Sequence, residues 1–222
     1  MLINLFPNVD WQDMWEATLE TLYMTVISVS ATFVLGILLG LLLFLTETGN
    51  LWQNKPVNTV VAAIVNIFRS IPFIILIILL VPFTMWLVNT MLGANAALPA
   101  LIIGAAPFYA RMVEIALREI DKGVIEAAKS MGATDRQIIL KVLLPESLPA
   151  LISGITVTAI ALISYTAMAG VVGAGGLGTL AYLDGFQRYQ NDVTFVATVI
   201  ILIIVFILQW IGDYFTHITD KR

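Results

Sequence analysis

One uncharged apolar stretch near the start of the chain limits its fold more than any other feature. From Leu22 to Leu45 there is no Asp, Glu, Lys or Arg. A helix that crosses the hydrocarbon core of a bilayer needs about 20 such residues. The 222 residues as a whole are 59% hydrophobic and 12% charged, whereas soluble domains are about 45–50% apolar and about 25% charged. The sequence therefore predicts an all-α integral membrane protein and excludes a soluble enzyme.

Four further apolar stretches bring the predicted number of spans to five. The second stretch, residues 57–82, stays apolar as far as Val88 but contains Pro72 and Pro82. Each proline removes a backbone donor and favours a kink, so we expect one broken span followed by an interfacial stretch. The first span is expected at residues 22–45, and the other three at residues 96–117, 150–172 and 193–214.

The residues before the first span are also patterned. Apolar residues recur there at spacings of three and four, with acidic residues between them, and they include Trp11 and Trp15. This pattern suits a short helix at the membrane surface with its tryptophans at headgroup depth. The first turns of the first span would show the same pattern, and both interpretations stay open.

Positive charge orients the five predicted spans. With the N-terminus outside, nine of the eleven Lys and Arg residues lie on the cytoplasmic side: Lys55, Arg111, Arg118, Lys122, Lys129, Arg136, Lys141, Lys221 and Arg222. Arg188 stays outside, and Arg69 lies within the second span. Because Lys and Arg favour cytoplasmic loops, we expect an external N-terminus and a cytoplasmic C-terminus.

Residue counts exclude most catalytic chemistry. The chain has no cysteine and only one histidine, His217, so disulfides, thiol catalysis and Cys or His metal sites are not expected. A net charge of −4 leaves no basic surface for nucleic acid. There is no G-x-x-x-x-G-K-[ST] run, and we therefore expect no ATP hydrolysis by this chain and no cofactor within it.

One glycine run matches a nucleotide-binding pattern formally. Gly173, Gly175 and Gly178 satisfy G-x-G-x-x-G, with Asp192 following. That pattern indicates a dinucleotide site only between a strand and a helix of a βαβ unit, which a membrane span excludes. We expect the run, including Gly176, to make a tight turn with close backbone packing instead.

The longest polar segment, residues 118–146, lies on the predicted cytoplasmic side. Glu126 to Met131 favours a short helix that ends at Gly132, and Thr134 or Asp135 would begin a second helix that Pro145 ends. Such a pair would form a rigid projection with a tip of small residues. An ordinary solvated loop is the alternative that these residues leave open.

The same segment resembles the EAA motif of permeases from ATP-binding-cassette importers. The resemblance rests on Glu126-Ala127-Ala128, on Gly132 after three intervening residues, and on Leu144-Pro145. Val142 departs conservatively from the isoleucine that is usual there. The resemblance implies that the segment docks on a separate ATPase subunit, with contacts from Glu126, Ala127, Ala128, Ser130, Met131, Gly132, Ala133 and Gln137.

The resemblance extends over nearly the whole chain. The runs 66–76, 104–114 and 173–178 are similar to those of methionine-importer permeases, while Arg69-Ser70-Ile71-Pro72 departs from the Arg-Gly-Thr-Pro run of polar amino acid permeases. The resemblance implies a type I permease fold, a homodimer of permease chains and two ATP-binding subunits that carry ATP and Mg. It also implies an extracytoplasmic methionine-binding lipoprotein, L- and D-methionine as substrates, and a location in the bacterial cell membrane.

Ionisable side chains within the membrane distinguish ion-coupled carriers from other classes of transporter. The only carboxylates near the spans are Glu114 and Asp213, so an ion-coupled carrier is disfavoured. Arg69 lies beside Pro72 in the broken span. We expect it to play a structural part, by pairing with Glu114, by extending toward the inner face, or by binding carbonyls freed at the kink.

The fourth span is the expected lining of the pathway. Its outer half contains Ser164, Tyr165 and Met168 among small residues, which suits a helix that faces protein or a cavity. Met168 would close a constriction where two copies meet, or it would only fill a packing gap. The overall prediction is alternating access driven by the ATPase. Its alternatives are an importer for another small amino acid or peptide and a membrane scaffold that passes no substrate.

Overall fold

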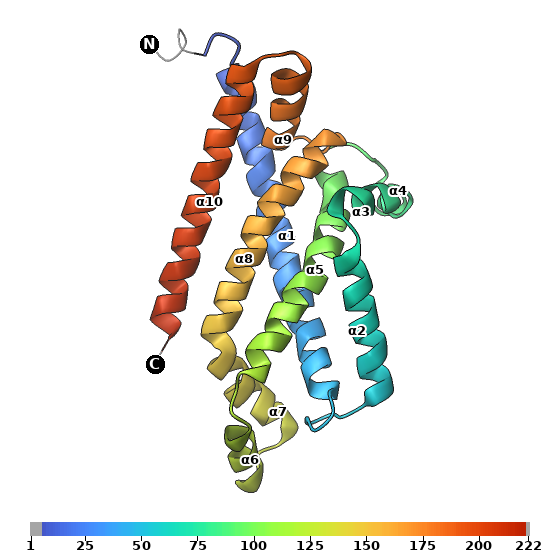
Figure 1. Ribbon diagram of the computed structural model, residues 1–222, viewed down its shortest axis with the longest axis vertical. Helices are drawn as coiled ribbons and strands as arrows, with labels where there is room; N and C mark the ends of the chain where they lie inside the picture. Colours follow the sequence, from blue (N-terminus) through green and yellow to red (C-terminus); the bar gives the residue numbers. More distant parts are fainter. Residues whose placement is uncertain (1–5, 221–222) are drawn as a thin grey trace.

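The computed structural model describes residues 6–220, in which every regular element is a helix (Figure 1). In chain order the elements are α1 (Trp11–Thr46), α2 (Lys55–Ser70), α3 (Phe73–Leu79), α4 (Val81–Val88), α5 (Ala94–Arg118), α6 (Lys122–Ser130), α7 (Asp135–Ile138), the π-helical turn η2 (Ile139–Leu143), α8 (Leu144–Val171), α9 (Gly176–Leu180), the π-helical segment η3 (Ala181–Gln187) and α10 (Asn191–Thr219). In this part of the chain, four helices are long and apolar enough to cross a membrane, and the bent pair α2–α3 makes a fifth if it counts as one span. The predicted all-α membrane fold is confirmed.

The first helix is longer than the uncharged stretch predicted. The side chain of Asp10 accepts hydrogen bonds from the backbone N–H groups of Gln12 (2.8 Å) and Asp13 (3.3 Å) and so caps α1. The helix continues without a break to Thr46. The tryptophan-rich residues are therefore the first turns of α1, and the separate surface helix is the wrong one of the two alternatives.

Helices α1 and α5 pack closely because two glycines on α1 have no side chains. A Cβ on Gly36 would lie 2.4 Å from Cδ1 of Tyr109, and one on Gly40 would lie 2.5 Å from Cβ of Val113. Glycines four residues apart allow this close approach between membrane helices. The spacing of Gly36 and Gly40 is visible in the sequence, although this contact was not among the predicted features.

The second apolar stretch is sharply bent. Helix α2 ends at Ser70, Pro72 precedes α3, and the axes of α2 and α3 differ by 106°. Proline supplies no backbone donor and restricts the residue before it to extended conformations, which accounts for the break. Pro82 lies in the first turn of α4, where a missing donor costs nothing.

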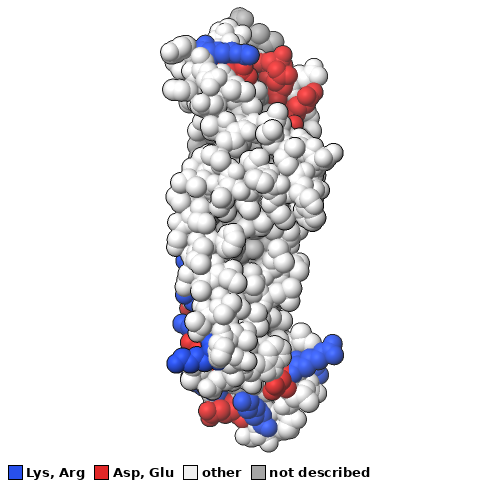
Figure 2. Space-filling model, turned by 90° about the vertical axis from the view of Figure 1, so that its right-hand side faces the viewer, with Lys and Arg blue, Asp and Glu red and all other residues white. Residues whose placement is uncertain are grey.

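The long helices run between two ends of different composition. Charged side chains gather at both ends of the face that Figure 2 shows, with a broad uncharged zone between them. Helices α6 and α7 lie at one end, toward which α10 also runs, and the chain begins at the other end (Figure 1). Lys221 and Arg222, two of the expected cytoplasmic cations, lie outside the described residues.

The glycine run folds α9 back onto α8. Gly173, Gly175 and Gly176 have φ values of +92°, +84° and +76°, which favour glycine. A Cβ on Gly178 would lie 2.5 Å from the backbone of Ala167. After this turn, α9 and η3 follow each other directly as one helical stretch before α10, in a region where the sequence predicts only a tight turn.

Candidate functional site

Two short helices project from the bundle, and each has a defined start. The backbone N–H of Gly123 donates to the side chain of Asp121 at the start of α6 (2.7 Å). Thr134 caps α7 and forms a capping box with Gln137, whose side chain accepts from the backbone N–H of Thr134 (2.8 Å). Between them Gly132 has φ +81°, a value that suits the predicted corner. The segment is an ordered helical corner, and the solvated loop is the wrong alternative.

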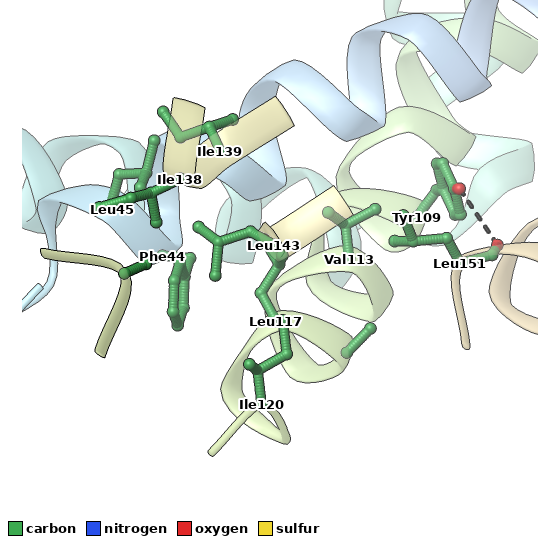
Figure 3. Packing of buried hydrophobic residues seen from close by; sticks show 12 residues of the cluster. Phe44, Leu45, Tyr109, Val113, Leu117, Ile120, Ile138, Ile139, Leu143 and Leu151 are labelled. Atoms are coloured by element: carbon green, nitrogen blue, oxygen red, sulfur yellow. Dashed lines mark hydrogen bonds between the residues drawn. The ribbon is translucent and has the colours of Figure 1, made fainter. Parts of the chain in front are cut away.

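The corner is fixed to the bundle by its apolar side (Figure 3). Ala128, Ile138 and Leu143 are buried in one cluster with the end of α1 and the end of α5. The cluster also contains Phe44 and Leu45 of α1, Val113 and Leu117 of α5, and Ile120, which follows α5. Burial of this kind contributes about 25 cal/mol per Å² of apolar surface, and it holds the corner against the ends of α1 and α5.

A polar contact also ties the corner to the α1–α2 connection. The indole N–H of Trp52 donates to Oδ2 of Asp135 at the start of α7, over 3.0 Å. The two residues are far apart in sequence, and no local pattern connects them.

The expected ATPase contacts divide into exposed and enclosed residues. Met131 is 82% exposed at the corner, and Glu126, Ala127, Ser130, Gly132 and Gln137 are exposed as well. Ala128 is buried and Ala133 is partly buried, since both face the apolar cluster. Ala128 is therefore not available on the surface of this chain, and the expectation that it contacts a partner needs this correction.

The second short helix does not end at Pro145, where the sequence predicts its end. The π-helical turn η2 joins α7 directly to α8, and Pro145 lies in the first turn of α8. A proline in the first turn of a helix interrupts no hydrogen bond, because the backbone N–H that it lacks would have no partner there. The helix therefore continues. The corner and α8 are consequently one continuous helical segment from Asp135 to Val171.

Charged residues at the end of α5 form a network that excludes one predicted pair. The buried carboxylate of Glu114 accepts from Arg111 and from Arg118 (2.7 Å). Arg118 also binds Glu47 at the end of α1 through two hydrogen bonds of 2.8 and 3.1 Å. Glu114 is thus neutralised by its own helix, and its expected pairing with Arg69 is wrong.

Arg69 lies instead at a hollow beside the α2–α3 bend. The hollow has about 580 Å³ of space, open solvent at its mouth included. Its lining consists of Phe68, Arg69, Ile71, Phe73, Leu76, Gly104, Phe108 and Tyr165. The rings of Phe73 and Tyr165 are parallel, with centroids 4.5 Å apart. The structure thus brings together Arg69 and Tyr165, for which the sequence predicts different roles.

One face of α8 is uncovered beyond this hollow. Ser164 is exposed, Met168 is 44% exposed, and Val171 at the end of the helix is 44% exposed. These residues recur at spacings of three and four and therefore share a helix face. The packing-gap alternative for Met168 does not fit a side chain that is almost half exposed in the single chain.

Metal ligation has no evident place in the described part of the chain. Residues 6–220 contain no group of three or more His, Cys, Asp or Glu side chains that could hold a metal ion. What the arrangement offers is a projecting corner for a partner, a broken helix, and a hollow in the apolar zone.

These features, together with sequence comparison, define the class of protein. The family described as binding-protein-dependent transport system inner membrane component matches residues 33–221. The chain belongs to this family, and it is a multi-pass membrane protein with the type I importer permease fold.

Individual similar proteins include methionine permeases. Over its full length the chain is 71% identical to the whole methionine import system permease protein MetP of Bacillus subtilis (strain 168). It is 50% identical to a probable D-methionine transport system permease, MetI, of Pasteurella multocida (strain Pm70), with 96% of this chain and 98% of that protein covered. The fold matches a permease chain of the inward-facing MetNI methionine transporter with a TM-score of 0.93 and 46% identity, over 96% of this chain and 100% of that chain.

Proposed function

We propose that this chain is the permease subunit of an ATP-driven importer for methionine, of the L form and also of the D form. The observation that carries the proposal is the 71% identity to a methionine import permease over the full length of both chains. The hollow with its cation and aromatic rings is chemically suited to a small amino acid.

The proposed assembly has two copies of this chain and two ATP-binding subunits, with ATP and Mg bound by those subunits and not by this chain. A methionine-binding lipoprotein would deliver substrate at the outer end. The N-terminus is placed outside and the C-terminus in the cytoplasm, an orientation supported by the excess of Lys and Arg near α6 and α7.

Coupling would run through the projecting corner. Glu126, Ala127, Met131 and Gly132 present an exposed surface of small and flexible side chains, which suits insertion into a groove of the ATPase subunit. The apolar cluster beneath the corner links it to α1, α5 and α8. Movement of two corners toward each other would then rock the bundles between inward- and outward-facing states.

ATP must supply a definite free-energy difference to switch the permease between its two states. To move a two-state equilibrium from 1:99 to 99:1, a ligand must favour one state by about 5.5 kcal/mol. In the proposed mechanism this difference comes from ATP binding between the two ATPase subunits. An ion-coupled carrier needs a carboxylate within the membrane that is free to bind its ion, whereas the buried carboxylate of Glu114 is already paired with Arg111 and Arg118.

The experiment is uptake of labelled L-methionine by proteoliposomes that contain this chain and its ATPase subunit, with MgATP inside and the binding protein outside. We expect uptake that needs ATP, is competed by D-methionine, and continues with a proton uncoupler present. If the proteoliposomes took up another amino acid in an ATP-dependent way but no methionine, that amino acid would be the substrate. An assembled complex that transports no amino acid or peptide would favour a scaffold.

A further inference from the structure

The hollow at the α2–α3 bend contains a cation that the fold does not neutralise. Arg69 lies about 21 Å along α2 from Lys55, at 1.5 Å per residue, and its side chain is exposed in the single chain. With Lys55 at the cytoplasmic surface, as the distribution of Lys and Arg predicts, Arg69 would lie within a hydrocarbon core of about 30 Å. Within residues 6–220 its guanidinium has no hydrogen bond and no ion pair. Because a charge at this depth is costly, an unpaired arginine there points to an anionic ligand.

The remainder of the lining is mostly apolar and aromatic. Phe73 and Tyr165 stack with an interplanar angle of 1°, and Phe108 contributes a third ring. A Cβ on Gly104 would lie 3.3 Å from both Leu76 and Phe73, so the absence of a side chain at this position relieves crowding between α5 and α3. A cation beside such a surface complements a small molecule that has a carboxylate at one end and an apolar group at the other.

We propose that this hollow is a binding subsite for the transported amino acid, with the Arg69 guanidinium on the substrate α-carboxylate. The rings of Phe73, Phe108 and Tyr165 would contact the apolar side chain. Guanidinium and carboxylate form paired, charge-assisted hydrogen bonds, and a thioether makes favourable contacts with aromatic rings. This inference rests on the proposed function as an amino acid importer and replaces the structural role first expected for Arg69.

Binding at such a site has to be weak enough for release. A pathway works only if its sites bind substrate firmly enough to admit it and loosely enough to let it leave. The hollow meets this condition because one charged group and a partly open mouth replace the enclosed, many-contact pocket of a receptor.

The first test is uptake of methionine by the complete importer with Arg69→Gln and Arg69→Lys. Loss of a charge-assisted contact corresponds to about a tenfold or greater fall in uptake for Arg69→Gln, with partial recovery in Arg69→Lys. Lys55→Gln is the matched control, since it removes a cation from the same helix outside the hollow. We expect its uptake to stay within about twofold of wild type.

The second test reads occupancy and does not depend on transport by Arg69→Gln. Because the chain has no cysteine, Ile71→Cys places a single thiol at the bend, in the lining of the hollow. Methionine should slow the modification of this thiol by a thiol reagent in the complex without ATP, and the protection should disappear in the double variant with Arg69→Gln. Val60→Cys, at a position 58% exposed on α2, should show no protection.

The outcomes separate the two proposals. Equal uptake by wild type and Arg69→Gln, or no protection of the Ile71→Cys thiol at saturating methionine, would overturn the subsite while leaving methionine import intact. Absence of methionine uptake by the wild-type importer would overturn the proposed function and the subsite with it. Protection by phospholipid headgroups but not by methionine would assign Arg69 to lipid and overturn the subsite.

Discussion

At the scale of single residues, the backbone of the glycine run binds a negatively charged group, and this group is a side chain of the same protein. The backbone N–H of Gly176 donates to Oε2 of Glu20 over 2.6 Å, and the backbone N–H of Leu177 donates to the hydroxyl of Thr21 over 2.9 Å. Successive N–H groups beside left-handed glycines form a concave site for negative charge. The run resembles a phosphate-binding loop because both use this backbone geometry.

Glu20→Ala tests the importance of this contact. The substitution leaves the Gly176 N–H without its acceptor in a partly buried site, and we expect a loss of about 1–3 kcal/mol in the free energy of unfolding. SDS denaturation of the purified permease in mixed micelles measures it. Glu16→Ala, one turn earlier on the same helix, where the carboxylate accepts only from the side chain of Gln12, should change stability by less than about 0.5 kcal/mol. Equal effects of the two substitutions would contradict the role of Glu20.

At the scale of elements, the corner between α6 and α7 depends on one backbone conformation. The N–H of Gly132 donates to the carbonyl of Lys129 over 2.9 Å, and the N–H of Ala133 donates to that of Ala128 over 3.1 Å. The first donor is the N–H of Gly132 itself, whereas the second follows Gly132 in the chain and reaches its acceptor because Gly132 has a positive φ.

Gly132→Pro should disrupt the corner. Proline fixes φ near −65° and has no N–H, so the substitution removes one bond and forbids the turn. We expect at least about a tenfold loss of methionine uptake, and less ATPase subunit copurifying with the permease, while the permease stays in the membrane. Gly132→Asn is the control, because asparagine tolerates left-handed conformations. Normal uptake by the proline variant would rule out the corner as the coupling element.

How much of these elements the sequence could predict depends on whether the signal was local. The apolar stretches, the break at Pro72 and the cap at Thr134 are encoded within a few residues, and sequence reasoning found them. The sequence predicted the end of α7 wrongly, because proline usually ends a helix. In the structure, Pro145 follows a π-helical turn within one continuous helical segment. The partners of Glu20 and Trp52 were out of reach, since Gly176 and Asp135 lie far away along the chain.

The candidate site was predictable in part for the same reason. Exposure of Met131 follows from its place beside the Gly132 corner. The hollow joins α2, α3, α5 and α8, and nothing in the spacing of Arg69, Gly104 and Tyr165 indicates that they meet. Pairing with Glu114 was one of three roles expected for Arg69, because both are charges near spans, whereas Glu114 pairs with two arginines of its own helix.

At the scale of the whole molecule, the uncovered face of α8 predicts where two copies meet. Met168→Cys would introduce the only thiol in the chain. In the proposed homodimer, the two introduced thiols should crosslink across the interface in the resting state, and the crosslink should be lost when ATP traps the outward-facing state. Gel mobility under non-reducing conditions measures it. Phe206→Cys, at a position 68% exposed on α10, is the control on another face. A Met168→Cys variant that crosslinks in neither state would contradict this interface.

The continuity of α7, η2 and α8 makes the permease a mechanical lever. Helix α8 has 28 residues and is therefore about 42 Å long. A tilt of about 5° imposed at the corner would displace its far end by about 4 Å, more than the width of a water molecule, without any helix melting or re-forming. A small movement of the ATPase subunits would then open or close a gate on the opposite side of the bilayer. The rigidity of this one helix would determine how far the gate moves.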